Sequence, residues 1–468
     1  MRRPGGRRPL IVAGAVVCAV ALAAVATDAG AGAWIEARTG TAPALTATTD
    51  ADARALITAP LPAGHIMALP TVSGGTVPDA ATLAAAIAAA PTDGLKGGRY
   101  GIVTDPAGGT VLYDQGATQA VMPASTMKLL TVTAALDLLG PDHRFTTRAV
   151  RTAPGTVVLV GGGDPYLSSG SVAAAHPERA GLDDLAAQTA AALTAAGSTS
   201  VALRWDASLF SGPSLHPDWP AAYADQVTPV TALMTNEGRL SGVSPGPRTR
   251  TPSADAAQAF AGALSARGIT VTGTTALDGA LPAGAEELGR VESMPLSTIV
   301  ETLLTSSDND AAEAIGHQVG IAAGAGGSFA GGASAVEQVL RRRGLWDEGA
   351  VLRDGSGLSR DNRVTPQMLA RAVSLATTDA AFRPLLTGLP VAGATGTLTS
   401  RFARPGAEAG RGEVRAKTGT LSGTSALAGY AVTVSGGVVT YAFVVNDANN
   451  DDTARAWLDR ASSAVAAG

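Results

Sequence analysis

The chain has 468 residues, a mass of 46.3 kDa and a formal net charge of −5, with 46% hydrophobic and 16% charged residues. This apolar content excludes a chain that is disordered throughout, and the length is sufficient for one or two packed cores. The negative net charge argues against a nucleic-acid partner. Only three of the 34 basic residues are lysines, namely Lys96, Lys128 and Lys417.

The first 26 residues have the pattern of an export signal. Four arginines precede an apolar run from Leu10 to Ala26, and Ala24-Val25-Ala26 offers the small residues that signal peptidase requires. We therefore predict a signal peptide over 1–26 and an exported protein that acts outside the cytoplasm. The alternative is an uncleaved membrane anchor, because the run is near the lower length limit of a spanning helix. The single cysteine, Cys18, lies in this run, so a mature chain would have no disulfide, no thiol nucleophile and no zinc-cysteine site.

A linker rich in Ala, Thr and Pro is predicted over 27–90, with a short alanine run near its end that is compatible with a helix. Beyond the linker, short strand-like runs at Tyr100–Thr104 and Thr110–Tyr113 flank a turn-rich stretch and predict a hairpin. Pro123 then precedes Ala124–Leu139, in which apolar residues recur at helical spacing. This pattern places Ser125 at the start of a helix.

The middle of the chain, from about Thr146 to Val291, alternates strand-like and alanine-rich helical stretches, and we interpret it as a separate subdomain. After it, Pro295–Gly320 has a helical period that a polar stretch at 305–310 interrupts. The expected strands are 156–160, 200–205, 269–275, 414–418, 426–434 and 438–446, and the expected helices are 182–196, 255–267 and 452–466.

Ser125 and Lys128 form a Ser-x-x-Lys motif on the first predicted helix of the folded part. Residues three apart on a helix lie on one face about 5 to 6 Å apart, so the lysine amine can reach the serine hydroxyl. A lysine with a lowered pKa can activate serine as a nucleophile, and the helix start offers backbone N–H donors to an oxyanion. An exposed serine and lysine that share a face by chance are the alternative.

The second motif is Ser307-Asp308-Asn309, within the polar interruption. Alternate residues of a short loop can point the Ser307 hydroxyl and the Asn309 amide into one cleft, where the first can relay a proton and the second can hold a substrate carbonyl. Helix capping is the alternative, because Ser, Asp and Asn are also the residues that N-caps prefer.

The third motif is Lys417-Thr418-Gly419-Thr420, at the end of a strand-like stretch. A strand edge of this composition can lie beside an extended peptide, with Lys417 and the hydroxyls of Thr418 and Thr420 facing a carboxylate. Gly419 would permit close approach of the two chains. A surface turn is the alternative interpretation.

Two of the three lysines fall in these motifs, and the motifs occur in the order Ser-x-x-Lys, Ser-Asp-Asn, Lys-Thr-Gly. With this set the chain resembles the penicillin-binding protein and serine β-lactamase superfamily, and within it the class C low-molecular-mass D-alanyl-D-alanine carboxypeptidase/endopeptidase family. The resemblance extends from about Leu83 to the C-terminus. Further segments similar to that family are Val160–Pro165, Asp206–Pro213 with Trp219, Arg353–Ser359 and Val364–Pro366.

The resemblance implies an α+β fold of the penicillin-binding/β-lactamase-like transpeptidase type, with an antiparallel sheet flanked by helices, an all-helical part and an inserted subdomain. It assigns 91–150 and 290–468 to the catalytic domain and 151–289 to the insert. For two of the similar segments, Gly161–Asp164 and Asp354–Gly357, structural turns are the favoured interpretation, because their residues are those that turns require.

The resemblance also implies a role for each motif residue. Ser125 would be the acylated nucleophile, Lys128 its proton acceptor and Ser307 the proton shuttle to the leaving D-alanine. Asn309 would hold the substrate amide, and Lys417, Thr418, Gly419 and Thr420 would bind the end of the substrate that carries the carboxylate. The backbone N–H groups of Ser125 and Thr420 would form the oxyanion hole.

The expected partners are a peptidoglycan stem peptide ending in D-Ala-D-Ala and β-lactam antibiotics as covalent inhibitors. No cofactor, metal or nucleic acid is expected, and a membrane would be contacted only through an uncleaved N-terminal segment. The resemblance leaves open how removal of the terminal D-alanine compares with cutting of cross-links.

Other functions remain as alternatives. A β-lactamase or esterase of the same superfamily would use the same residues for acylation, and a catalytically silent envelope protein would keep the fold alone. A Ser-His-Asp hydrolase is disfavoured, because the G-x-S-x-G match at 242–246 has Pro245 after the serine, and proline lacks the backbone N–H that the oxyanion needs. The five histidines show no metal-binding spacing.

Overall fold

The computed structural model describes residues 75–170 and 179–468. The predicted signal peptide, Cys18 and most of the predicted linker lie outside these ranges. Within the described ranges, no helix is both long and apolar enough to cross a membrane.

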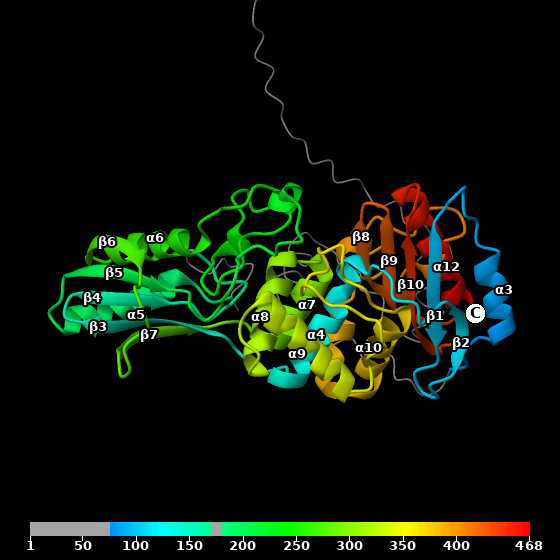
Figure 1. Ribbon diagram of the computed structural model, residues 1–468, viewed down its shortest axis with the longest axis horizontal. Helices are drawn as coiled ribbons and strands as arrows, with labels where there is room; N and C mark the ends of the chain where they lie inside the picture. The colour runs from blue at the N-terminus through cyan, green and yellow to red at the C-terminus, as the bar shows by residue number, and fades with distance from the viewer. Residues whose placement is uncertain (1–74, 171–178) are drawn as a thin grey trace, which may run out of the picture. The chain divides into compact units, whose positions relative to one another are not determined.

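The first sheet is antiparallel and joins the two ends of the described chain. Its strands follow the order β2-β1-β10-β9-β8 (Figure 1). They span Gly98–Thr104 (β1), Val111–Gln115 (β2), Val414–Leu421 (β8), Thr424–Val432 (β9) and Val438–Asn446 (β10). The hairpin and the three C-terminal strands are therefore confirmed, and β4 (Thr156–Val160) and β10 have the bounds that the sequence predicts.

Helices cover both faces of this sheet. The α3 and α12 helices (Ala80–Ala88 and Asp451–Ala467) pack on one face, and α10 (Pro366–Thr378) packs on the other. Successive residues of β10 therefore enter different cores: Phe443 joins the α3/α12 side, whereas Ala442 and Val444 join the α10 side. Both faces are buried, and β10 accordingly lacks polar alternation: between Val438 and Val445, Thr440 and Tyr441 alone carry a polar atom in the side chain.

The all-helical part is built around α4 (Met127–Leu139). Every residue of α4 from Met127 to Leu136 is buried, as expected for a helix surrounded by others. Its neighbours include α7 (Leu296–Ser306), α8 (Asn309–Ala322), α9 (Phe329–Arg342) and α10 (Figure 1). A short helix, α11 (Arg383–Thr387), follows α10. The predicted helical segment with a polar interruption is confirmed as α7 and α8.

The inserted part forms a second, mixed sheet in the order β6-β5-β4-β3-β7, with β4–β5 and β5–β6 parallel and the other pairs antiparallel. The helices α5 (Leu182–Ala195) and α6 (Pro252–Ser265) share a hydrophobic core with it. The remaining strands are Thr146–Ala153 (β3), Ser200–Asp206 (β5), Thr270–Ala276 (β6) and Glu286–Glu292 (β7).

Two predicted boundaries fall inside strands of the structure, and a third lies just beyond a helix. The insert boundaries at 150/151 and 289/290 cut through β3 and β7, whereas the stretch from about Thr146 to Val291 that the sequence pattern marks contains nearly all of both strands. The linker boundary at 90 lies beyond α3, which starts at Ala80 behind the N-cap Asp79 and buries Leu83 and Ile87 in the core of the first sheet. This helix therefore packs as part of the first domain. The α+β class with flanking helices, an all-helical part and an insert is confirmed.

Candidate active site

Ser125 lies in a 3-10 turn, Ala124–Thr126, that continues directly into α4. Ala124 has φ 47°, a left-handed conformation that is unusual for alanine and must be held by its surroundings. Two glycines permit this. A Cβ on Gly357 would lie 2.0 Å from the Ala124 carbonyl oxygen, and one on Gly419 would lie 2.6 Å from that of Pro123. The turn that carries Ser125 is thus fixed by close backbone contact with two distant segments.

Lys128 is completely buried, and its Nζ has three hydrogen-bond partners. It lies 3.0 Å from Ser125 Oγ, 2.7 Å from Asn309 Oδ1 and 2.8 Å from the Ser356 carbonyl oxygen. Two of these partners can only accept, so an uncharged amine would donate to both and keep its lone pair for the Ser125 hydroxyl proton. Burial lowers the pKa of Lys128 to about 8, against the opposing effect of nearby carboxylates, chiefly Glu313.

The Ser356 carbonyl belongs to a loop that sequence reasoning treated only as a turn. Glu313 on α8 accepts hydrogen bonds from the backbone N–H groups of Gly355 (3.1 Å) and Ser356 (2.8 Å). Asp354 accepts from Gly357 N (2.8 Å) within the same loop. Burial raises the pKa of Glu313, with a contribution from Asp354. The acidic residue at 313 was missed, and no local pattern marks it, because its partners lie 42 and 43 residues away.

The Ser307-Asp308-Asn309 motif forms the junction between α7 and α8. Ser307 ends α7 in a left-handed conformation with φ 59°, and Asp308 caps α8 by accepting from Ala311 N at 3.0 Å. Asp308 is therefore a helix cap, while its two neighbours contact the two lysines. Asn309 contacts Lys128 as above, and Ser307 Oγ lies 2.7 Å from Lys417 Nζ.

Lys417 lies on β8, is completely buried, and also donates to the Thr418 carbonyl at 2.7 Å. Burial lowers the pKa of Lys417 well below its usual value, and the neighbouring Lys128 lowers it further. Across residues 75–170 and 179–468, no carboxylate forms an ion pair with this amine. Because an anion beside this amine would stabilise its charged form, the site favours binding of an external carboxylate.

One cavity of about 660 Å³ connects the three motifs. Ser125, Ser307, Asn309, Thr418 and Thr420 line it, whereas the two lysines lie beneath this lining and Gly419 packs against Pro123. The inserted part adds a further wall, made of Tyr223, Asp225, Gln226, Ser244 and Pro245.

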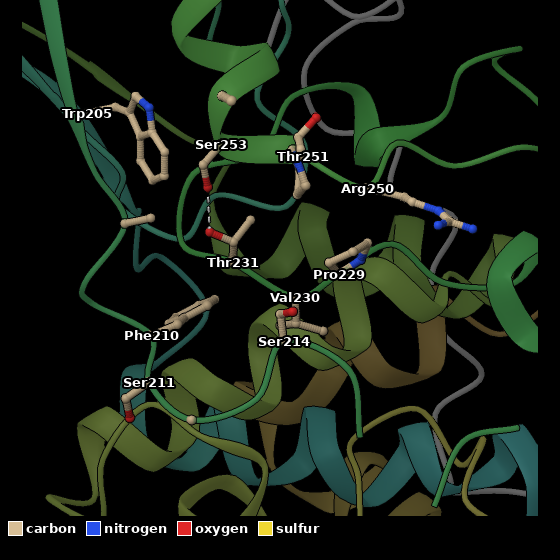
Figure 2. A pocket seen from close by; sticks show the side chains of 14 residues that line it. Trp205, Phe210, Ser211, Ser214, Pro229, Val230, Thr231, Arg250, Thr251 and Ser253 are labelled. Atoms are coloured by element: carbon tan, nitrogen blue, oxygen red, sulfur yellow. Dashed lines mark hydrogen bonds between the residues drawn. The ribbon is translucent and has the colours of Figure 1, made fainter. Parts of the chain in front are cut away.

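A second cavity, of about 390 Å³, lies elsewhere and contains none of the motif residues (Figure 2). Its lining includes the Trp205 and Phe210 rings and the Thr231 and Ser253 hydroxyls, which are 2.8 Å apart. The one titratable side chain that lines it is Arg250. No acid, base or nucleophile pair lines this cavity, whereas the cavity at Ser125 has a serine hydroxyl 3.0 Å from a buried lysine amine and is therefore the candidate active site.

Comparison with known proteins decides the family. Residues 80–244 and 241–465 match the D-Ala-D-Ala carboxypeptidase 3 (S13) family. The chain belongs to this family. Carboxypeptidase Rv3627c of Mycobacterium tuberculosis is 38% identical over 403 residues, which cover 81% of this chain and 84% of the relative. Carboxypeptidase DacB of Mycolicibacterium smegmatis is also 38% identical, covering 81% and 82% of the two chains.

Solved structures show the same fold. Penicillin-binding protein 4 (dacB) from Haemophilus influenzae superimposes with a TM-score of 0.65 at 20% identity, covering 82% of this chain and 98% of that protein. A second structure of the Haemophilus protein, complexed with a β-lactam, has a TM-score of 0.61 at 20% identity and covers 81% and 97%. The protein is thus a serine-type D-alanyl-D-alanine carboxypeptidase of the low-molecular-mass class C type, and its substrates are peptides ending in D-Ala-D-Ala.

Proposed function

We propose that the protein removes the terminal D-alanine of peptidoglycan stem peptides through an ester formed on Ser125. Ser125 Oγ attacks the carbonyl carbon of the penultimate D-alanine, and Lys128 Nζ accepts the hydroxyl proton. The carbon–nitrogen bond then breaks, D-alanine leaves, and water hydrolyses the ester. The observation that carries this proposal is the buried Lys128 amine, which has a lowered pKa and lies 3.0 Å from Ser125 Oγ.

The remaining motif residues would support the two proton transfers and the developing negative charge. Ser307, hydrogen-bonded to Lys417, would pass a proton to the leaving amine. Asn309 would hold the substrate amide while its Oδ1 orients Lys128. The backbone N–H groups of Ser125 and Thr420 would stabilise the oxyanion, and Thr418, Thr420 and the Lys417 charge would bind the terminal carboxylate.

A β-lactam offers a strained acyl group to the same nucleophile, so we infer that it inhibits by forming a long-lived ester. The β-lactam complex of the Haemophilus protein supports this inference. A β-lactamase would differ in hydrolysing that ester rapidly.

We also propose that residues 1–26 direct export and that the enzyme works outside the cytoplasm, where its substrate lies. The apolar run after four arginines supports this. In the domain assignment, the first sheet with the all-helical part would form the catalytic domain, and the second sheet with α5 and α6 would form the insert.

We expect labelled penicillin to attach to Ser125 of the purified protein. Trypsin should release 100–128 as one peptide, in which Ser125 is the sole serine, so fragment spectra can place the adduct. The same preparation should release D-alanine from a peptide ending in D-Ala-D-Ala, and a cross-linked dimer in parallel would measure endopeptidase activity. An adduct on another residue, or none, would contradict the assignment of the nucleophile.

The rate of acylation should depend on pH through Lys128. The base form is the uncharged amine, which gains population as pH rises towards the pKa of about 8. We therefore expect the second-order rate constant of penicillin acylation to rise by about tenfold per pH unit below the pKa and to level off above it. Stopped-flow labelling between about pH 6 and pH 9 measures this profile. A rate constant that stays flat up to pH 8 would show that Lys128 is not the base.

A further inference from the structure

The insert contributes more than a wall to the active site. Its segment Gln226–Arg248, between β5 and α6, contacts three consecutive residues of the α7–α8 junction, Asp308, Asn309 and Asp310. The segment lies 60 or more residues away in sequence from this junction. We refer to Gln226–Arg248 as the clamp segment.

Asp308 is held by Arg239 of the clamp segment. The Arg239 guanidinium forms a short ion pair with Asp308 Oδ2, while Asp308 Oδ1 caps α8. The Asp308 side chain is 2% exposed, so its charge has little access to water. Glu237, with an oxygen 3.8 Å from Arg239, faces the guanidinium from the clamp segment itself. The orientation of Asp308 therefore depends on Arg239.

Asn309 bridges the clamp segment and the base. Its Nδ2 donates to the Gln226 carbonyl at 3.0 Å, and its Oδ1 accepts from Lys128 at 2.7 Å. Since one amide group makes both contacts, a shift of the clamp segment would alter the contact with Lys128.

Asp310 is held by two groups of the same segment. Thr228 N donates to Oδ1 at 2.6 Å, and Arg248 Nη2 lies 3.4 Å from Oδ2. Arg248 also donates to Ser244 Oγ at 2.9 Å and to the Val243 carbonyl at 3.2 Å. Ser244 lines the catalytic cavity, so Arg248 connects the cavity wall to the junction.

We propose that Arg239 and Arg248 are positioning residues for acylation, which hold Ser307 and Asn309 in place through the aspartates beside them. The proposal rests on the proposed acyl-enzyme mechanism. Ser307 and Asn309 reach Lys417 and Lys128 from a junction in which Ser307 adopts a left-handed backbone. Such a backbone persists only where its surroundings determine it. The backbone hydrogen bond from Asp308 N to the Leu303 carbonyl (3.0 Å) closes this turn, and the ion pairs of Asp308 and Asp310 fix the side chains that follow it.

The test compares Arg239→Gln and Arg248→Gln with Arg267→Gln. Arg267 is a matched control, because it pairs with Asp183 at 2.8 Å within the insert and does not line the catalytic cavity. Stopped-flow labelling with fluorescent penicillin gives the rate constant for ester formation, the dissociation constant of the complex that precedes it and the final labelled fraction. In Arg239→Gln and Arg248→Gln, we expect the rate constant to fall by about tenfold or more while the labelled fraction stays full. In the Arg267→Gln control, the rate constant should equal that of the wild type.

A purely structural role would give a different result. Partial unfolding lowers the labelled fraction, whereas the folded remainder reacts at the wild-type rate. That outcome, or a rate constant within about twofold of wild type in both variants, would overturn the proposal. If Arg239→Gln gives no folded protein, the rate constant of Arg239→Lys is measured and judged by the same criterion. Lysine keeps the positive charge at this position but lacks the two-pronged hydrogen bonding of the guanidinium group. Wild-type labelling at Ser125 is measured first, so failure of the acyl-enzyme mechanism itself is recognised separately.

Discussion

In the Lys128→Arg variant, we expect penicillin acylation of Ser125 to fall by about a thousandfold or more. General base catalysis contributes about a hundredfold to ten-thousandfold, and arginine, with a pKa above about 12, retains its proton at every accessible pH. Burial lowers the pKa of Lys128 to about 8, so this amine is able to accept a proton near neutral pH. The positive charge is kept in the variant, so the loss would report the missing base. Stopped-flow labelling measures the acylation rate constant of each protein, and a thermal melt shows whether each protein is folded.

Lys96→Arg is the matched control, because Lys96 is the third lysine and its side chain is exposed. We expect it to acylate at the wild-type rate. A Lys128→Arg protein that is folded and acylates within about tenfold of wild type would show that another group is the base.

The second large effect concerns Lys417, whose replacement by alanine should distinguish substrates with and without a terminal carboxylate. We expect Lys417→Ala to lower kcat/KM by about tenfold to 150-fold for a D-Ala-D-Ala peptide, because a hydrogen bond to a charged group contributes about 1.5 to 3 kcal/mol. The C-terminal amide of the same peptide has no charge and should lose far less. Released D-alanine and D-alanine amide give the two rates.

The contact of Lys417 with Ser307 makes the result decisive. If Lys417 acts mainly in proton transfer through Ser307, acid and amide substrates should lose activity equally, and the carboxylate assignment would be wrong. Lys128→Ala supplies the reference for that outcome, because loss of the base should affect both substrates alike.

Sequence patterns predicted part of the geometry of the candidate active site, because two of its relations are local. Ser125 and Lys128 share a helix face at a spacing of three, and the structure places their atoms 3.0 Å apart. The polar interruption at 305–310 predicted a helix junction, and α7 ends where α8 begins. That the three motifs line one cavity was inferred from the family resemblance. The motifs are far apart in the sequence, so their spacing along the chain does not predict how close they lie in the fold.

The features that sequence patterns missed share a physical cause. The β3 and β7 strands carry Arg, Glu and Thr among few apolar residues, so no apolar alternation marks them. The assigned insert bounds, 151–289, therefore cut both strands, although the broader stretch from about Thr146 to Val291 contains nearly all of them. The sequence did not show that α3 packs against the first sheet. Its two large buried side chains, Leu83 and Ile87, are a weak signal in an alanine-rich stretch.

By itself the sequence determined the nucleophile candidate and the lysine beside it, because helical period and motif spacing act over a few residues, and the fold class followed from the family resemblance that the three motifs carry. Only the tertiary structure decided which distant groups tune that lysine. The Ser356 carbonyl, Asn309 and Glu313 come from segments more than 180 residues further along the chain than Lys128. Their positions depend on the packing of α4 against α8 and on close backbone approach at Gly357. Such contacts follow from the assembled core, where burial sets both the geometry and the pKa of Lys128.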